Sequence, residues 1–280
     1  MSNNYTKGAI NGFIIGDILG NATNGMTKTD IHNTYYSFGF GLDKSFRPCN
    51  IPIDTKRTPY GPGELSDITE NFLISIKSVI NNGNYSLIQL KEEYMIWSII
   101  SSKKLHINKE LLCNIAQLMV CSLINTRDYK TILCADIYFN CLLINKVINM
   151  DRKQNIDTVI TDTIEEMENI YTQNEINMLK QYINYTTYDE IENDILNTVV
   201  FCIVALKKVA VSENKTDVFM EIVMEAVREG GNAHINCALV GMICGAYIGY
   251  DKLPEDILNN IQYKQKLDTL VNLFLSKTYQ

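Results

Sequence analysis

The 280-residue sequence predicts an all-α protein, a single compact multi-helix bundle that spans residues 1–280. Apolar residues recur every three to four positions almost throughout the chain, which is the period of an amphipathic helix. Short loops rich in Asn, Gly and Asp separate these stretches, and no repeat or linker divides them. Together these observations predict one domain of roughly ten to twelve helices.

The predicted helices follow one another along the chain. The first covers residues 8–20, where glycines alternate with apolar residues around Asp17. Later helices are centred on apolar stripes, and short loops are expected at 81–84, 125–128 and 212–214. The stripes lie within residues 72–80, 111–122, 132–143, 195–206 and 235–248.

Residues 34–62 do not fit a helical pattern. They contain four of the five prolines in the chain and several glycines. Proline and glycine disfavour helix interiors, so the segment predicts a long surface loop, with a short hairpin near 35–42. Loops of this length in compact domains are usually functional or mobile.

Composition limits the partners. The net charge is −7, and no basic patch of the kind that follows a phosphate backbone is present, which argues against a nucleic-acid partner. No apolar run reaches the ~18 residues of a membrane span. Residues 1–7 are polar and Asp17 interrupts the next apolar run, so we expect neither a signal peptide nor membrane association.

The eight cysteines are scattered and form no C-x-x-C pair. This pattern predicts buried free thiols in a reduced compartment, hence an intracellular and cytoplasmic protein, rather than a disulfide framework or a zinc site. The chain is rich in Ile, Asn, Lys and Tyr, a bias typical of an AT-rich genome such as that of a large DNA virus.

The segment 230–250 is the most informative part of the sequence. The paired glycines Gly230 and Gly231 open directly onto a predicted helix rich in Ala and Gly, with Asn232, His234 and Asn236 at its start. Backbone N–H groups at a helix start favour anions, so these five residues are candidates for substrate binding. The small residues that follow predict close packing against a neighbouring helix.

Four segments, in order, resemble the ADP-ribosylglycohydrolase family, all-helical hydrolases that release ADP-ribose from modified proteins. GAINGFIIGDILG (8–20) is similar to the family's opening helix, and GPGELSDITENFL (61–73) to its G-x-x-T-D-D-T-x-x-x-L segment. NTRDYKTILCADIYFNCLLI (125–144) resembles a central T-H-x-D-x-x-A segment. Residues 194–250 resemble the closing block that carries G-G-D-T-D-T-N.

The resemblance implies a hydrolase whose two Mg²⁺ ions lie between the T-D-D-T and D-x-D-T segments. Hard cations of this kind need several oxygen ligands, most of them anionic, and they would position the attacking water. In this chain Ser66 replaces the family threonine, Asp67 matches the first aspartate, Ile68 replaces the second, and Thr69 matches. In the closing block Asn232 and His234 replace aspartates and Ile235 replaces threonine.

Other family positions differ as well. Asn24 falls where the family has a glutamate, and Thr126 where it has a histidine, although Asp128 is retained. The nucleotide-binding loops correspond to 105–112 and 185–191, and neither contains glycine. Without glycine, backbone N–H groups approach phosphate less closely.

Each candidate residue also has a structural interpretation. Ser66 and Asp67 are typical of a helix N-cap and its first turn. His234 at a helix start is typical of a hydrogen-bonded structural histidine, because His234 and Asp67 alone are fewer ligands than a closed metal site needs. Gly230 and Gly231 are typical of a helix C-cap. Asp17 is expected to be a buried hydrogen-bonding residue.

Three hypotheses remain open. The first, which we favour, is a family member with impaired hydrolysis, because carboxylates are replaced at Asn24, Ile68, Asn232 and His234. The second is an active hydrolase with a remodelled single-metal site: Asp67 would be catalytic, and Ser66, Asp67, Asn232 and His234 would hold a weakly bound Mg²⁺ or none. The third is a structural or protein-binding module. The partner implied by the family is ADP-ribose or ADP-ribosylated protein.

Overall fold

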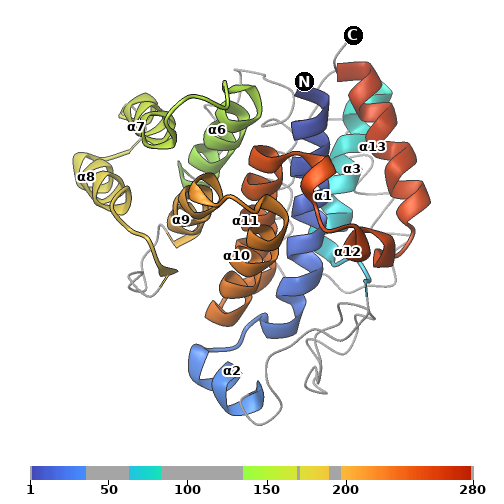
Figure 1. Ribbon diagram of the computed structural model, residues 1–280, viewed down its shortest axis with the longest axis horizontal. Helices are drawn as coiled ribbons and strands as arrows, with labels where there is room; N and C mark the ends of the chain where they lie inside the picture. The colour runs from blue at the N-terminus through green and yellow to red at the C-terminus, as the bar shows by residue number, and fades with distance from the viewer. Residues whose placement is uncertain (1, 36–62, 83–134, 169–170, 189–196, 279–280) are drawn as a thin grey trace.

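Two helices from opposite ends of the sequence, α1 (Ser2–Gly20) and α11 (Ala233–Ile248), lie side by side at the centre of the molecule (Figure 1). The computed structural model describes residues 2–35, 63–82, 135–168, 171–188 and 197–278. These residues contain eleven α-helices and no strand, which confirms the all-α prediction.

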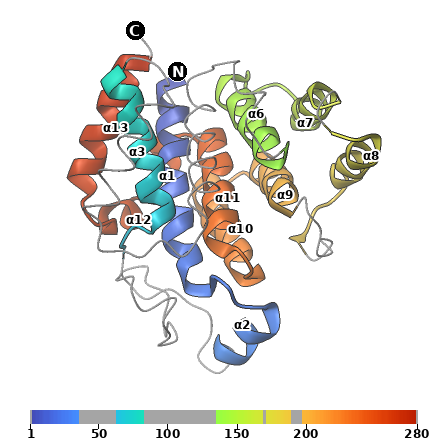
Figure 2. The same cartoon turned by 180° about the vertical axis from the view of Figure 1, so that it is seen from behind.

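The remaining helices surround this central pair. α3 and α13 lie on the α1 side, while α6, α9, α7 and α8 extend from the α11 side, as both Figure 1 and the reverse view in Figure 2 show. Their bounds are α2 Lys28–Tyr35, α3 Asp67–Asn82, α6 Ala135–Asn149, α7 Ile156–Glu166, α8 Gln173–Tyr182, α9 Asn197–Val211, α10 Lys215–Glu229, α12 Glu255–Asn260 and α13 Lys264–Thr278, with 3₁₀ turns at Asn21–Thr23 (η1) and Tyr250–Lys252 (η3).

Glycines bring α1 and α11 into backbone contact. Gly8, Gly12 and Gly16 recur at four-residue spacing on α1, so they share one face of that helix. A Cβ placed on Gly12 would lie 2.1 Å from the carbonyl oxygen of Gly241, and one on Gly16 would lie 1.9 Å from that of Cys237. The pair is antiparallel, and the predicted close packing of the small-residue helix is confirmed.

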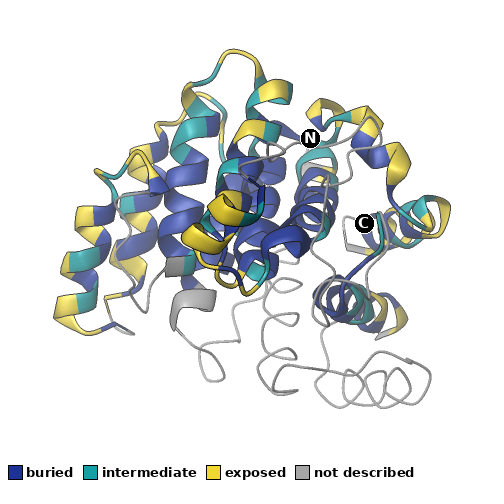
Figure 3. Cartoon of the chain, turned by 90° about the horizontal axis from the view of Figure 1, so that it is seen from below, coloured by how far each residue is buried: buried dark blue, intermediate teal, exposed yellow. Residues whose placement is uncertain are grey.

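Burial is highest in the inner helices, as Figure 3 shows. Along α11 almost every residue is buried, including the residues from Ala238 to Ala246, because other helices cover it on all sides. A helix that is covered on all sides is expected to be apolar around its whole circumference, as α11 largely is. α9 is similarly enclosed, and Val199 to Leu206 are all buried. The polar residues described below lie where α11 meets α1 and α3.

Several predictions depend on residues outside the described part of the chain. The expected loop at 34–62 is one: Thr34 and Tyr35 belong to α2, and residues 36–62, with the expected hairpin, are not described. The helix at 111–122 also falls outside. Cys141, Cys202, Cys237 and Cys244 are buried, as expected, and burial raises the pKa of the last three thiols. Among the described helices, none is long and apolar enough to cross a membrane.

Candidate functional site

Asp17 is the centre of a buried polar network where α1, α3 and α11 meet. It lies in the last turn of α1 and is completely buried. Its carboxylate accepts hydrogen bonds from Ser66 Oγ at 2.6 Å to Oδ1 and 2.7 Å to Oδ2, and from Thr69 Oγ1 at 2.6 Å to Oδ2. The Ser66 N–H donates to Oδ2 at 3.3 Å. A buried carboxylate needs such partners, because desolvation of an unpaired charge is very costly.

Ser66 has two roles at the start of α3. Its Oγ accepts the N–H of Ile68 at 3.1 Å, the hydrogen bond of an N-cap, while its hydroxyl proton points to Asp17. The N-cap interpretation of Ser66 is therefore confirmed, and Asp67 is the first-turn acid of α3. Thr69 lies on the same helix, so α3 presents both hydroxyls to Asp17.

His234 supplies the partner from α11. It is the second residue of that helix and is 6 % exposed. Its Nδ1 lies 3.0 Å from Asp17 Oδ1. Because the Asp17 oxygens already accept from Ser66 and Thr69, the carboxylate is the acceptor here as well, and Nδ1 donates. The expectation of a hydrogen-bonded histidine at a helix start is confirmed.

Asp67 lies at the edge of this network and is 8 % exposed. Burial raises the pKa of its carboxyl above 3.8, and the nearby charge of Asp17 raises it further. The positive potential of His234 and the N–H of Ile68 act in the opposite direction on the same pKa. Asp67 and Asp17 are therefore two carboxyl groups in one site, with His234 close to both.

The donor set does not fit a pair of magnesium ions. Ile68, where the family resemblance implies an aspartate, is 2 % exposed and packs in the hydrophobic core. Both oxygens of Asp17 already accept hydrogen bonds from the protein. Across the described ranges, no group of three His, Cys, Asp or Glu residues is arranged to hold a metal ion. Mg²⁺ and Ca²⁺ require more oxygen ligands than Asp67 offers.

The paired glycines form a turn whose N–H groups are already used. Gly230 is the C-cap of α10 with φ 71°, and its N–H donates to the Val227 carbonyl at 3.3 Å. The N–H of Gly231 donates to the Met26 carbonyl at 2.8 Å, and its own carbonyl accepts from Gly25 at 2.7 Å. The C-cap interpretation is confirmed for Gly230, and the N–H groups of both glycines already have backbone partners.

The asparagines do not join the Asp17 network. Asn232 is the exposed N-cap of α11, and its side chain makes no capping hydrogen bond. Asn236 is 8 % exposed and follows His234 by two positions, which places the two side chains about 200° apart around the helix. Asn24 ends the η1 turn and is partly exposed. Of the predicted site residues, the network therefore brings together Ser66, Asp67 and His234.

Sequence reasoning did not include Asp17 or Thr69 among the site residues. A usable signal was present for Asp17, because an aspartate within an apolar, glycine-rich helix must find buried partners. Its partners are 49, 52 and 217 positions away, and the sequence does not specify such separations. Thr126, Asp128 and the loop at 105–112 lie outside the described residues.

Comparison with known proteins agrees with this architecture. No curated protein matches the sequence. A solved structure described as an "ADP-ribosylglycohydrolase-related protein complex" shares the fold, with a TM-score of 0.69 and 15 % identity over 99 % of each chain. The family model for ADP-ribosylglycohydrolase matches residues 113–280, which is more than half of the chain. This protein therefore belongs to the ADP-ribosylglycohydrolase family.

Proposed function

We propose that this chain is an ADP-ribosylglycohydrolase-family protein whose hydrolysis is impaired and whose ligand is ADP-ribose or ADP-ribosylated protein. The replacement of carboxylates supports the proposal: the family resemblance implies aspartates at Ile68, which is buried in the core, and at His234, whose Nδ1 lies on Asp17. Two of the oxygen ligands that would position an attacking water are thereby replaced.

The site would lie where α3 and α11 begin. Ser66, Asp67 and His234 form its buried side, with Asn232 exposed beside them and the Gly230–Gly231 turn at its border. We include Asn236 among the substrate-binding candidates only from its position near the start of α11. The domain is proposed to span residues 1–280 as one unit.

A second candidate function is an active hydrolase with a remodelled site, and one observation favours it. Asp17 orients the His234 ring through Nδ1, and the Asp67 carboxyl, with its raised pKa, is close by. An imidazole held by one carboxylate beside a second carboxyl group is an arrangement suited to general acid–base catalysis.

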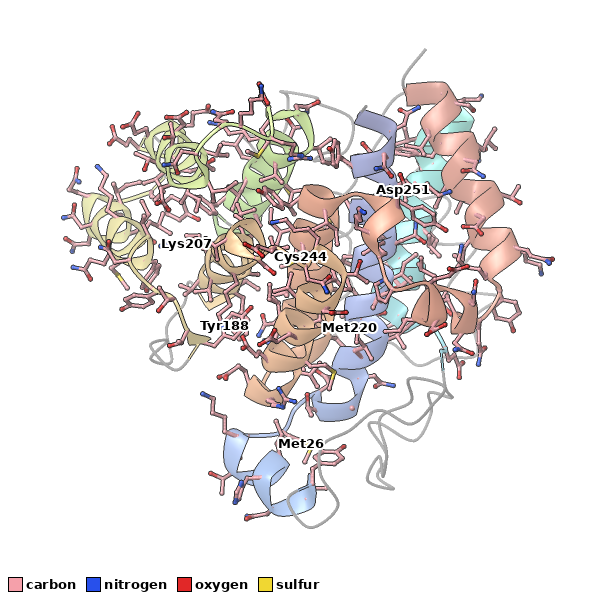
Figure 4. The ribbon with its side chains drawn as sticks, in the orientation of Figure 1. Met26, Tyr188, Lys207, Met220, Cys244 and Asp251 are labelled. Atoms are coloured by element: carbon pink, nitrogen blue, oxygen red, sulfur yellow. The ribbon has the colours of Figure 1, made fainter. Side chains whose placement is uncertain are left out.

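The test is release of ADP-ribose from arginine-linked and serine-linked ADP-ribosylated proteins. For wild-type protein with Mg²⁺ we expect a rate no higher than that of the protein-free reaction. Release by the wild type would overturn the proposal. If that release is lost in Asp67→Asn but kept in Asp251→Asn, the remodelled hydrolase is supported. Asp251 is the control because it is an exposed aspartate on η3 (Figure 4), and its backbone N–H donates to Asn4 Oδ1.

Ligand binding is measured separately by thermal unfolding with ADP-ribose. A ligand at about 100 times its Kd stabilises the folded state by about 2.7 kcal/mol, which shifts Tm by several degrees in a domain of this size. The proposal predicts such a shift. No shift with ADP-ribose or with an ADP-ribosylated peptide would instead favour a protein-binding module.

A further inference from the structure

We infer that His234 takes the place of divalent metal ions between α3 and α11 by donating a hydrogen bond to Asp17, so that the junction of α1, α3 and α11 is closed without metal. The inference rests on the proposed function only in treating this junction as the altered family site. The stability of this junction can be measured independently of catalysis.

The Asp17 carboxylate is the reason that the junction needs a partner from α11. Asp17 is completely buried, and its hydroxyl partners Ser66 and Thr69 both come from α3. Without His234, α11 would contribute no hydrogen bond to this carboxylate among the described residues. The Nδ1 contact at 3.0 Å therefore links α11 to the α1–α3 pair.

A carboxylate at position 234 would reverse this arrangement. An aspartate there would lie near Asp17 and Asp67, and three carboxyl groups in a buried site repel one another unless a cation lies between them. Histidine donates a hydrogen bond instead. Ile68 completes the change on α3, because its side chain packs in the core and provides no ligand.

The chemistry of the remaining donors leads to the same conclusion. Ser66 Oγ is engaged with Asp17 and with the Ile68 N–H, and Thr69 Oγ1 is engaged with Asp17. Among the described residues, Asp67 is the remaining carboxylate in this group. One carboxylate is a poor match for Mg²⁺, which demands near-octahedral oxygen coordination, and the described residues hold no three-ligand cluster.

The experiment measures thermal unfolding of the full chain in EDTA and in increasing Mg²⁺ or Mn²⁺, for the wild type, His234→Asp and His234→Gln. The wild-type Tm is expected to be the same in EDTA and in either metal, within about 1 °C. His234→Asp should unfold at least about 5 °C lower in EDTA and regain several degrees with metal. His234→Gln, which keeps an N–H donor, should lose less and show no response to metal.

Two results would overturn the inference. The first is a saturable rise of the wild-type Tm with Mg²⁺ or Mn²⁺, which needs no variant to be folded. The second is a His234→Asp protein with native helical circular dichroism that is as stable as the wild type in EDTA. Failure of the proposed function is distinguishable, since metal-free release of ADP-ribose by the wild type would contradict impairment while leaving this inference intact.

Discussion

Gly12 on α1 and Gly241 on α11 lie backbone against backbone at the centre of the molecule. A Cβ on Gly12 would come 2.1 Å from the Gly241 carbonyl oxygen, and a Cβ on Gly241 would come 2.0 Å from the Gly12 carbonyl oxygen. Contacts this short leave no room for a methyl group. Because neither glycine has a side chain, the helices that carry Asp17 and His234 can pack with their backbones in contact.

Gly241→Ala is expected to destabilise the protein by about 3 kcal/mol or more, because both backbones must move apart. Gly231→Ala is the matched control. A Cβ at Gly231 meets nothing within 4 Å, and the cost is that of its positive φ alone, about 1–2 kcal/mol. Urea denaturation of both variants tests this, and equal losses would show that α1 and α11 are not in backbone contact.

Arg152 joins two helix ends at the other end of the bundle. Its guanidinium donates to the Val147 carbonyl of α6 at 2.7 Å and to the Ala246 carbonyl of α11 at 3.0 Å, and it stacks 3.7 Å from the Tyr5 ring centroid. Hydrogen bonds from a charged donor contribute about 1.5–3 kcal/mol each.

Arg152→Ala is therefore expected to lower the free energy of unfolding by about 2–4 kcal/mol. Arg152→Lys should recover less than half of this loss, since a single ammonium group cannot reproduce the planar fork. The exposed Arg228 on α10 provides the control, and its alanine variant should change stability by about 0.5 kcal/mol or less. Similar Tm values for Arg152→Ala and Arg228→Ala would contradict the bridging role.

Replacing tyrosine by phenylalanine is expected to have opposite effects on stability at Tyr188 and at Tyr35. The Tyr188 ring stacks on Phe201 with centroids 4.7 Å apart, beside α9 in Figure 4, and its buried hydroxyl has no hydrogen-bond partner among the described residues. The Tyr35 hydroxyl, in contrast, donates to the Ala22 carbonyl at 2.9 Å.

Tyr188→Phe should leave the stability unchanged or raise it by about 1 kcal/mol, because it removes a buried hydroxyl that has no partner among the described residues. Tyr35→Phe should cost about 0.5–1.5 kcal/mol, because it removes a buried hydrogen bond. Thermal unfolding of the two variants side by side measures the difference. A larger loss for Tyr188→Phe than for Tyr35→Phe would contradict the described hydrogen bonding.

Asp67 makes stability depend on pH. Burial raises the pKa of its carboxyl in the folded state above the value of 3.8 expected in the unfolded chain. The folded state therefore binds the Asp67 proton more tightly than the unfolded chain does. This proton binding stabilises the folded state fully below pH ~4, and the stabilisation is lost as pH rises through the raised pKa. Asp67→Asn removes this loss.

The expected result is that Asp67→Asn is more stable than the wild type at pH 7 and that the difference in Tm shrinks toward pH 4. Paired thermal scans across this range measure it. A variant that is less stable than the wild type at every pH would show that ionised Asp67 stabilises the folded state.

The sequence predicted the fold well because helical periodicity is local. The apolar stripe at 72–80 lies within α3, and the stripe at 195–206 covers most of α9. The glycines of residues 8–20 lie on the face of α1 that packs against α11. The closeness of Ser66 and His234 depended on family resemblance, because they are 168 positions apart and no local rule brings such residues together. Asp17 at the centre of the network was missed as a site residue for the same reason.

Residues outside any regular pattern were the hardest to predict. Arg152 lies in a short polar turn after α6, where a basic residue near a helix C-terminus is common and rarely singled out. Its second acceptor, the Ala246 carbonyl, is 94 positions away. Gly230 was predicted as a cap from its neighbours alone, whereas the pairing of Gly231 with Gly25 and Met26 required the folded chain.

The most direct test of impaired hydrolysis is a single-turnover measurement with wild-type protein in excess over an ADP-ribosylated arginine substrate, at increasing Mg²⁺. The rate of ADP-ribose release is expected to stay at the protein-free level at every Mg²⁺ concentration, because the family resemblance implies metal-binding carboxylates where this chain has Ile68 and His234. A rate that rises and saturates with Mg²⁺ would contradict it.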